Sequence, residues 1–239
     1  MATPSKINTE PNTARSVAHW AGQMSGALVS FGTIMFLSAG TIRWTAGWVY
    51  LGINAFSQIL TAIVLIPRQP DLLAERSQVR EGTKSWDRFL APLIVVFGTL
   101  AVLVTAGLDF RFGWSVPINA SLWVTGLLLA FLSQMFVLWA MASNTFFATT
   151  VRIQADRGHN VVSVGPYHFV RHPGYLGSIL FNLMLPLMLR SLWTIVPAGL
   201  TIILLIVRTK LEDHTLQAEL PGYREYSANV RYRLIPGVW

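Results

Sequence analysis

The chain has 239 residues, of which 53% are hydrophobic and only 12% charged, and its mean hydropathy is +0.49. Soluble domains carry about 25% charged residues, so this composition excludes an ordinary soluble domain and indicates an integral membrane protein. The formal net charge of +7 comes from lysines and arginines dispersed among polar segments, which favours cytoplasmic loops of a membrane protein over a nucleic-acid partner.

The amino-terminal half alternates apolar segments with polar connectors. Residues 1–18 are polar, and we expect a tail there. Four apolar segments follow, each of roughly 20 residues, which is the length that a helix needs to cross the hydrocarbon core. They lie at about residues 24–42, 46–66, 89–107 and 118–142. The first is too long for the apolar region of a signal peptide, so we interpret it as an anchor and residues 19–142 as a four-span membrane domain.

A charged connector, residues 67–88, joins the second and third apolar segments. It contains Arg-Gln-Pro-Asp-Leu-Leu-Ala-Glu-Arg-Ser. This sequence is compatible with a short amphipathic helix at the membrane interface and equally with a solvated connector.

Two shorter apolar segments, 175–189 and 192–207, are separated at Arg190. If both cross the membrane as a hairpin, fifteen of the 18 basic residues fall on one side and only Arg43, Arg111 and Arg190 on the other. A single crossing would leave Arg190 in the membrane and divide the others 10 to 7. The positive-inside rule therefore predicts a hairpin, with both termini in the cytoplasm of a multi-pass protein of the inner cell membrane.

These segments together predict an all-α fold. We expect a polytopic transmembrane helical bundle, with four amino-terminal spans, a carboxy-terminal helical hairpin and a cytoplasmic cofactor pocket. Residues 143–239 would form the catalytic region.

Two polar blocks, residues 158–177 and 208–233, flank the hairpin. Because both feet of the hairpin lie on one face, we expect the two blocks to form one pocket. The acidic pair Glu212 and Asp213 follows an apolar helix, where it opposes the helix dipole, so a partner is expected: Arg208, Lys210 or a bound cation. Arg171, in the first of these blocks, could contribute to the pocket or could instead be an interfacial arginine whose side chain reaches toward water. No metal site is expected, because the chain has no cysteine and its histidines lack paired ligand spacing.

The motifs of this region occur in a characteristic order. They are Gly158-His159, Gly165-Pro166-Tyr167, Arg171-His172-Pro173, Tyr175 and Gly177, then after the hairpin Glu212-Asp213, Leu220-Pro221-Gly222-Tyr223-Arg224-Glu225-Tyr226 and Tyr232-Arg233-Leu234-Ile235-Pro236. In this order and spacing they resemble the isoprenylcysteine carboxyl methyltransferase family of integral membrane enzymes. The resemblance covers about the last 95 residues, and residues 70–76 also resemble bacterial members.

The resemblance implies S-adenosylmethionine as methyl donor, bound between the feet of the hairpin. The donor-binding residues that it implies are His159, Val161, Val162, Gly165, Pro166, Tyr167, His172, Pro173, Tyr175, Leu176, Glu212, Asp213, Tyr223 and Tyr226. The catalytic residues that it implies are Arg171, His172, Glu212, Arg231 and Arg233, with Arg231 and Arg233 as candidates for handling an acceptor carboxylate. The chain departs from the family at Asp213, because two glutamates are common at the acidic pair.

The expected chemistry suits a membrane site. Methyl transfer from a sulfonium requires positioning more than acid or base catalysis, and Tyr167 and Tyr175 could hold the cation through their rings. A carboxylate acceptor needs no general base, whereas an amine or phenol would need one, such as His172 or Glu212. We expect membrane lipids as partners and a lipophilic, prenylated or acylated acceptor that reaches the pocket sideways from the bilayer.

Two other functions compete with this interpretation. Sterol reductases have a similar carboxy-terminal segment and use a nicotinamide cofactor, but this chain is short for their usual number of spans. A small transporter is the non-enzymatic alternative, although the spans lack the intramembrane charges of ion routes. Their only central amides are Asn54, Gln58 and Gln134, for which packing between helices is the usual role.

Overall fold

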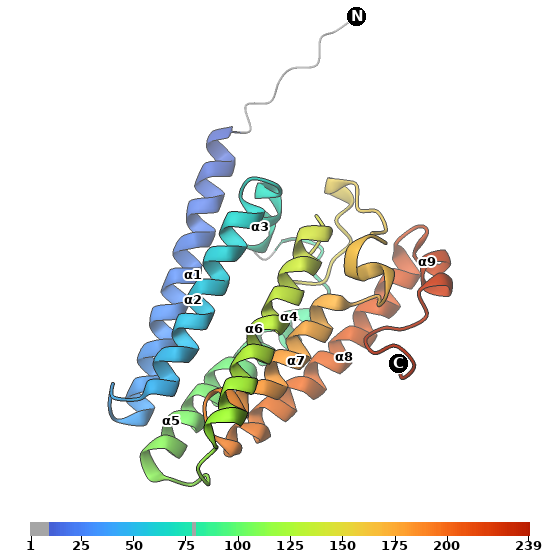
Figure 1. The fold of residues 1–239 in the computed structure, drawn as a ribbon. Helices are drawn as coiled ribbons and strands as arrows, with labels where there is room; N and C mark the ends of the chain where they lie inside the picture. The colour runs from blue at the N-terminus through green and yellow to red at the C-terminus, as the bar shows by residue number, and fades with distance from the viewer. Residues whose placement is uncertain (1–9, 78–79) are drawn as a thin grey trace, which may run out of the picture.

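Long helices run side by side in the structure, a computed structural model that describes residues 10–77 and 80–239 (Figure 1). The helices are α1 (Glu10–Ala39), α2 (Thr45–Leu65), α3 (Pro70–Arg76), α4 (Asp87–Val95), α5 (Val102–Phe112), α6 (Ala120–Ser143), α7 (Pro173–Met188), α8 (Ile195–Glu219) and α9 (Tyr223–Asn229). Short helical turns are η1 (Val96–Ala101), η2 (Ala155–Arg157), η3 (Gly165–His168) and η4 (Leu192–Thr194). No strand occurs in these two described ranges, which confirms the predicted all-α class.

Four helical segments among the described residues are long and apolar enough to span a membrane. They are Thr45–Leu65, Asp87–Phe112, Ala120–Ser143 and Leu192–Glu219. The helix α7 is apolar but shorter, and it forms the predicted hairpin with α8. The first predicted segment lies largely within α1, which is not among the four and begins at Glu10, inside the predicted tail. The fold is therefore a polytopic helical membrane bundle.

Local sequence accounts for several helix boundaries. The side chain of Asn119 accepts a hydrogen bond from Leu122 N (2.9 Å) and caps α6. Pro173 begins α7 at the first helical position, where a missing N–H is tolerated. Within the connector after α2, residues 70–76 form the short helix α3 and are not a solvated loop, because Leu72 and Leu73 are buried against the bundle.

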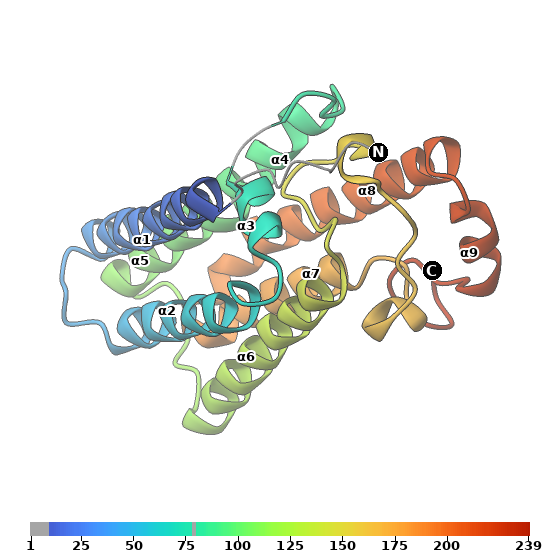
Figure 2. The same cartoon turned by 90° about the horizontal axis from the view of Figure 1, so that it is seen from above.

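Two glycines bring α6 and α7 close together. A Cβ on Gly126 would lie 2.5 Å from Leu187 Cβ, and one on Gly177 would lie 2.6 Å from Val137 Cγ2. Small residues at such crossings let membrane helices approach closely. This packing fixes the start of α7, and with it residues 171–175, beside the end of α6 (Figure 2).

Three turns gather at one end of the bundle: residues 40–44, 113–119 and 189–194. Asp109 accepts hydrogen bonds from Ser115 N (2.7 Å) and Ser191 Oγ (2.5 Å), and Arg190 Nη2 donates to Ile118 O (2.7 Å). This end carries Arg43, Arg111 and Arg190, the three basic residues that the charge count sets apart. The arrangement agrees with the predicted topology, whose orientation in the membrane stays a prediction.

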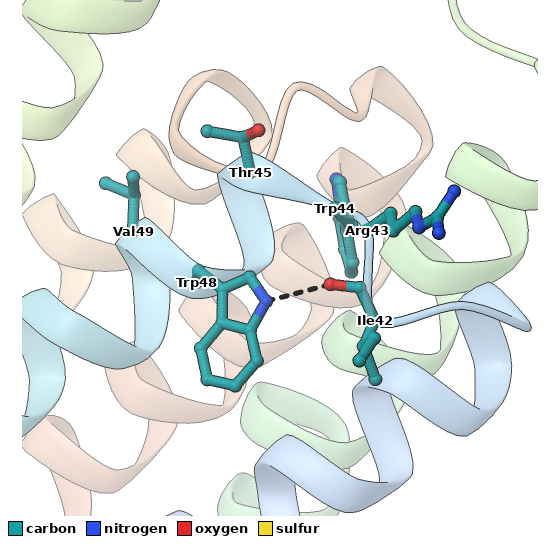
Figure 3. Close-up of a pocket in the computed structure, with 6 residues that line it drawn as sticks. All are labelled: Ile42, Arg43, Trp44, Thr45, Trp48 and Val49. Carbon is teal, nitrogen blue, oxygen red and sulfur yellow. Dashed lines mark hydrogen bonds between the residues drawn. The ribbon is translucent and has the colours of Figure 1, made fainter.

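The turn between α1 and α2 presents a shallow aromatic depression (Figure 3). Trp48 Nε1 donates to Ile42 O (2.8 Å), and the Trp48 side chain is 55% exposed beside Arg43. Exposed tryptophans collect where a membrane meets water, so this depression fits the bilayer interface at the end with the three turns.

Candidate active site

A large cavity of about 950 Å³ lies in the half of the bundle opposite the end with the three turns. Pockets that bind small molecules usually measure roughly 300–1,000 Å³, so this one has room for a sizeable ligand or for two. Its wall comes from α1, α2, α3, α4, η1, α6, α7, α8 and α9 and from the segment between α6 and α7. The cavity therefore joins both predicted polar blocks to the space between membrane-spanning helices.

Asp213 of α8 organises the charged side of the site. It is fully buried, and five side chains converge on its two oxygens: Arg171, His172, Gln217, Tyr223 and Arg233. Arg233 Nε donates over 2.8 Å, Tyr223 Oη donates over 3.1 Å, and Arg171 Nη1 forms an ion pair at 3.1 Å. His172 Nε2 lies 3.2 Å from the same carboxylate. Arg208, Lys210 or a bound cation was the expected partner of the acidic pair. For Asp213 this prediction is wrong, because Asp213 pairs with Arg171 and Arg233 and Lys210 is exposed.

The carboxy-terminal segment holds the loop before α7 in place. The backbone amides of Arg171 and His172 donate to the carbonyls of Tyr232 (2.9 Å) and Arg233 (3.0 Å). The side chain of Arg171 also reaches Arg231 O (3.4 Å). This pairing orients Arg171 and His172 toward the cavity, and both line its wall.

Glu212, next to Asp213 on α8, faces the cavity and has a different environment. It is half-buried, and Tyr175 Oη donates a hydrogen bond to its carboxylate. The guanidinium of Arg208 lies 5.5 Å from the centre of the Tyr175 ring and is paired with Asp87 at 2.7 and 2.9 Å. Arg208 was one expected partner of the acidic pair, and the structure gives it Asp87 instead. Glu212 therefore keeps an oxygen for a ligand.

Three tyrosines of the site remain protonated at neutral pH. Burial raises the pKa of Tyr167, Tyr223 and Tyr226, and the nearby charge of Asp213 raises the pKa of Tyr223 further. Each phenol therefore keeps its O–H as a donor: Tyr223 Oη donates to Asp213 (3.1 Å) and Tyr226 Oη donates to Tyr167 O (2.7 Å). Asn144 Nδ2 in turn donates to Tyr167 Oη (3.1 Å).

The packed rings of His159 and Phe146, whose planes are inclined at 32°, form another part of the wall. Their ring centres lie 4.6 Å apart, and both rings line the cavity. Burial and the charges of Arg152 and Arg157 lower the pKa of His159 to about 4, so the imidazole is neutral at physiological pH. Its Nδ1 accepts from Gln154 N (3.3 Å), which assigns the ring proton to Nε2.

The ring of Phe147 leaves no room for a side chain at position 174, which accounts for the glycine there. A Cβ on Gly174 would lie 2.4 Å from Phe147 Cε2, so the start of α7 closes directly over this ring. The guanidinium of Arg76 in α3 also lies over the Phe147 ring, 5.3 Å from its centre. Arg76 Nη1 donates a hydrogen bond to the backbone carbonyl of Phe147 (3.2 Å). Burial and the charge of Arg208 lower the pKa of Arg76 to about 10, which leaves it a cation at neutral pH.

The structure brings most predicted site residues to one wall. Those that line the cavity are His159, Val161, Val162, Tyr167, Arg171, His172, Tyr175, Glu212, Tyr223 and Tyr226. Gly165, Pro166, Pro173, Leu176 and Asp213 lie outside the wall. Arg233 is paired with Asp213, whereas Arg231 is exposed.

Sequence reasoning missed several residues of this wall. Phe146 and Asn144 lie at the end of the fourth apolar segment, where their position beside the polar block was the available signal. Arg76 and Asp87 belong to the connector after α2 and the start of α4. The resemblance of residues 70–76 to bacterial family members was the available signal for Arg76, whereas nothing in its local sequence distinguishes Asp87. Only the packing of α3 and α4 against the segment after α6 brings them to the site.

The fold and the site define a helical integral membrane protein with a deep pocket that combines arginine, histidine, tyrosine and glutamate side chains. Residues 125–218, which include most of this pocket, match the model of the Isoprenylcysteine carboxyl methyltransferase (ICMT) family. The match agrees with the family resemblance of the motifs over these residues. Tyr223, Tyr226, Arg231 and Arg233 lie beyond the matched residues. No curated protein matches the chain.

Proposed function

We propose that the protein transfers the methyl group of S-adenosylmethionine to a lipid-like acceptor at the cytoplasmic end of the bundle. The observation that carries this proposal is the single cavity, in which the polar pocket at the hairpin feet continues between membrane-spanning helices. A water-soluble donor and a membrane-embedded acceptor can therefore meet without either leaving its own solvent.

The residues at the polar end fit the chemical groups of the donor. The backbone polar groups of Val161 and Val162 make no hydrogen bond to another described residue, so they are free to bind the edge of a purine ring. The packed rings of Phe146 and His159 offer aromatic contact for the same base. Glu212 suits a ribose hydroxyl or the amino group. When bound, S-adenosylmethionine supplies an electrophilic methyl group on a sulfonium.

The cavity contains side chains that can bind a cation and side chains that can bind an anion. The ring of Tyr167 and the face of Tyr175 opposite Arg208 can stabilise a sulfonium by about 0.5–2 kcal/mol through cation–π attraction. Arg171 Nε is buried and has no hydrogen-bond partner among the described residues. A carboxylate oxygen in the cavity, from donor or acceptor, would satisfy it with a charge-assisted hydrogen bond.

In this proposal Asp213 acts through its neighbours. It lies behind the wall and fixes Arg171 and His172, which do line the cavity. Arg233 completes this buried cluster, and the exposed Arg231 remains a candidate for contact with the head of the acceptor. We expect the site to face the cytoplasm, because fifteen of the 18 basic residues fall on its side of the predicted topology.

Equilibrium binding of S-adenosylmethionine and of a reduced nicotinamide to the purified protein tests this function. We expect the first to bind and the second not to bind. His172→Ala, Tyr175→Ala and Glu212→Gln should each weaken donor binding by about 1–3 kcal/mol, because each removes a group that contacts the donor in this proposal. His168→Ala is the matched control, since His168 lies in the same loop and is exposed.

Nicotinamide binding without S-adenosylmethionine binding would favour the reductase alternative. Binding of neither ligand, or donor binding by all three folded variants as tight as in the wild type, would refute the proposed site.

A further inference from the structure

The cavity has a second, uncharged polar wall between the spans. Four side chains of α2 contribute to it: Asn54, Ser57, Gln58 and Thr61. Their spacing of three, four and seven residues places them on one face of the helix. Polar side chains in a membrane-spanning helix are costly unless they face an interior partner, so this stripe indicates that α2 turns toward something polar.

The helices that enclose the cavity add to this wall. Further uncharged polar residues that line it are Thr99, Gln134, Ser178, Asn182 and Thr201. Asn182 lies two turns along α7 from Tyr175, a distance of about 10 Å at 1.5 Å per residue. Thr201 lies the same number of residues along α8 from Arg208. The uncharged wall is thus about 10 Å deeper in the bundle than the charged site.

Several polar atoms around the cavity lack a partner. In the described part of the chain, four buried side chains have a nitrogen or oxygen without a hydrogen bond, and three of them line this cavity: Ser57, Arg171 and Asn182. Ser57 and Asn182 are only 5% and 8% exposed. An unpaired buried polar group costs about 1–3 kcal/mol, so a hydrogen-bonding ligand at this wall would be strongly favoured.

The available atoms indicate what the ligand must offer. Asn182 Nδ2 donates to Ser178 O (2.8 Å), which leaves Oδ1 as an acceptor. Ser57 Oγ can donate or accept. Packing between helices explains Asn54 and Gln134, which share a hydrogen bond of 3.4 Å across α2 and α6, but it does not explain Ser57 or Asn182. The ligand group must therefore include a donor, and it is uncharged because none of the side chains that form this second wall carries a charge to pair with it.

We propose that this wall binds a hydroxyl or amide N–H group carried by the tail of the acceptor, about 10 Å from the methyl-transfer end. The acceptor is then a lipid with a neutral hydrogen-bonding group within its tail, such as a hydroxylated or amide-linked chain, and not a plain hydrocarbon chain. This inference rests on the proposed function for the identity of the ligand as acceptor. The recognition itself depends only on Ser57, Asn182 and their neighbours.

Matched fatty acids test the inference directly. The probes are octadecanoic acid and a series of hydroxyoctadecanoic acids with the hydroxyl at successive positions, competed against radiolabelled octadecanoic acid on the full-length protein in detergent. We expect a mid-chain isomer to bind about fivefold or more tightly than octadecanoic acid, since one hydrogen bond contributes about 1 kcal/mol. Isomers with the hydroxyl near either end should show no advantage.

Variants link this preference to the wall. Ser57→Ala and Asn182→Leu should each reduce it toward that of octadecanoic acid. Ser133→Ala is the matched control, because Ser133 is equally buried in α6 but donates to Leu129 O (2.7 Å) and lies outside the cavity wall. Should Asn182→Leu fail to fold, the smaller change at Ser57 still provides the test.

Equal affinity for every isomer and for octadecanoic acid would overturn the inference. A preference that survives in both folded variants would do so too. The measurement needs no methyl donor, so these results are separate from the donor titration: a protein that binds S-adenosylmethionine but shows no hydroxyl preference refutes the tail site alone.

Discussion

Asp213→Asn separates the stability of the site from its binding function. The substitution keeps the size of the side chain and removes its charge. Asp213 is fully buried, and the Arg171 side chain that it pairs with is only 6% exposed. Arg171 would therefore keep an uncompensated buried charge, whereas Arg233, at 29% exposure, can turn toward water.

The magnitude follows from this difference in burial. Removing one partner of a buried ion pair costs about 3–5 kcal/mol. We expect the lower end, about 3 kcal/mol, because the asparagine oxygen can still accept from Tyr223 or Gln217. For a chain of this length 1 kcal/mol corresponds to about 2–4 °C, so the midpoint of thermal unfolding in detergent should fall by about 6–12 °C.

Glu212→Gln is the matched comparison, one residue away. Glu212 is half-buried, and Tyr175 Oη can still donate to the amide oxygen of glutamine, so the loss of stability should be about 1 kcal/mol or less. Donor binding should weaken all the same. If Asp213→Asn unfolds at the wild-type temperature, the buried charge cluster does not hold the loop before α7, and the reasoning is wrong.

Three further predictions concern packing, pH and the carboxy-terminal arginines. Gly177→Ala should lower the free energy of unfolding by about 1–3 kcal/mol through overpacking against α6, whereas Gly199→Ala, which has open space around it, should not; equal effects would contradict the close approach. His159 has its pKa lowered from 6.5 to about 4, so the folded state resists protonation and should lose stability as the pH falls from 6.5 toward 4; His159→Asn should lose less in thermal unfolding across that range, and parallel pH profiles would disprove the shift. Arg233→Ala should lower the unfolding temperature and Arg231→Ala should not, because of these two arginines only Arg233 contacts Asp213. A larger loss in Arg231→Ala would show that the contact between Arg233 and Asp213 does not stabilise the fold.

The membrane class and the family could be predicted from the sequence alone. Spans of apolar residues and the distribution of basic residues are local properties, because the bilayer imposes its thickness and its charge asymmetry on each segment separately. The motifs around Arg171-His172-Pro173 and Glu212-Asp213 are equally local, and they indicated the family whose model matches residues 125–218.

The partners within the site depend on contacts between distant segments. Glu212 and Asp213 are neighbours in sequence, yet the helix turns one toward the cavity and buries the other under Arg171 and Arg233. The pairing of Arg208 with Asp87 joins residues 121 positions apart, so no local pattern could predict it. In each case the physical reason is burial, which requires every charge to find an opposite partner wherever the fold supplies one.

For the polar wall of the cavity, too, the sequence identified residues whose role only the tertiary structure decided. The sequence identified Asn54, Gln58 and Gln134 as amides within the spans and assigned them to packing, which is their usual role. Whether a polar side chain on a membrane helix faces a neighbouring helix or a cavity depends on the rotation of that helix about its axis. Contacts with the rest of the bundle determine that rotation, so only the tertiary structure could show that these amides line the same space as Ser57 and Asn182.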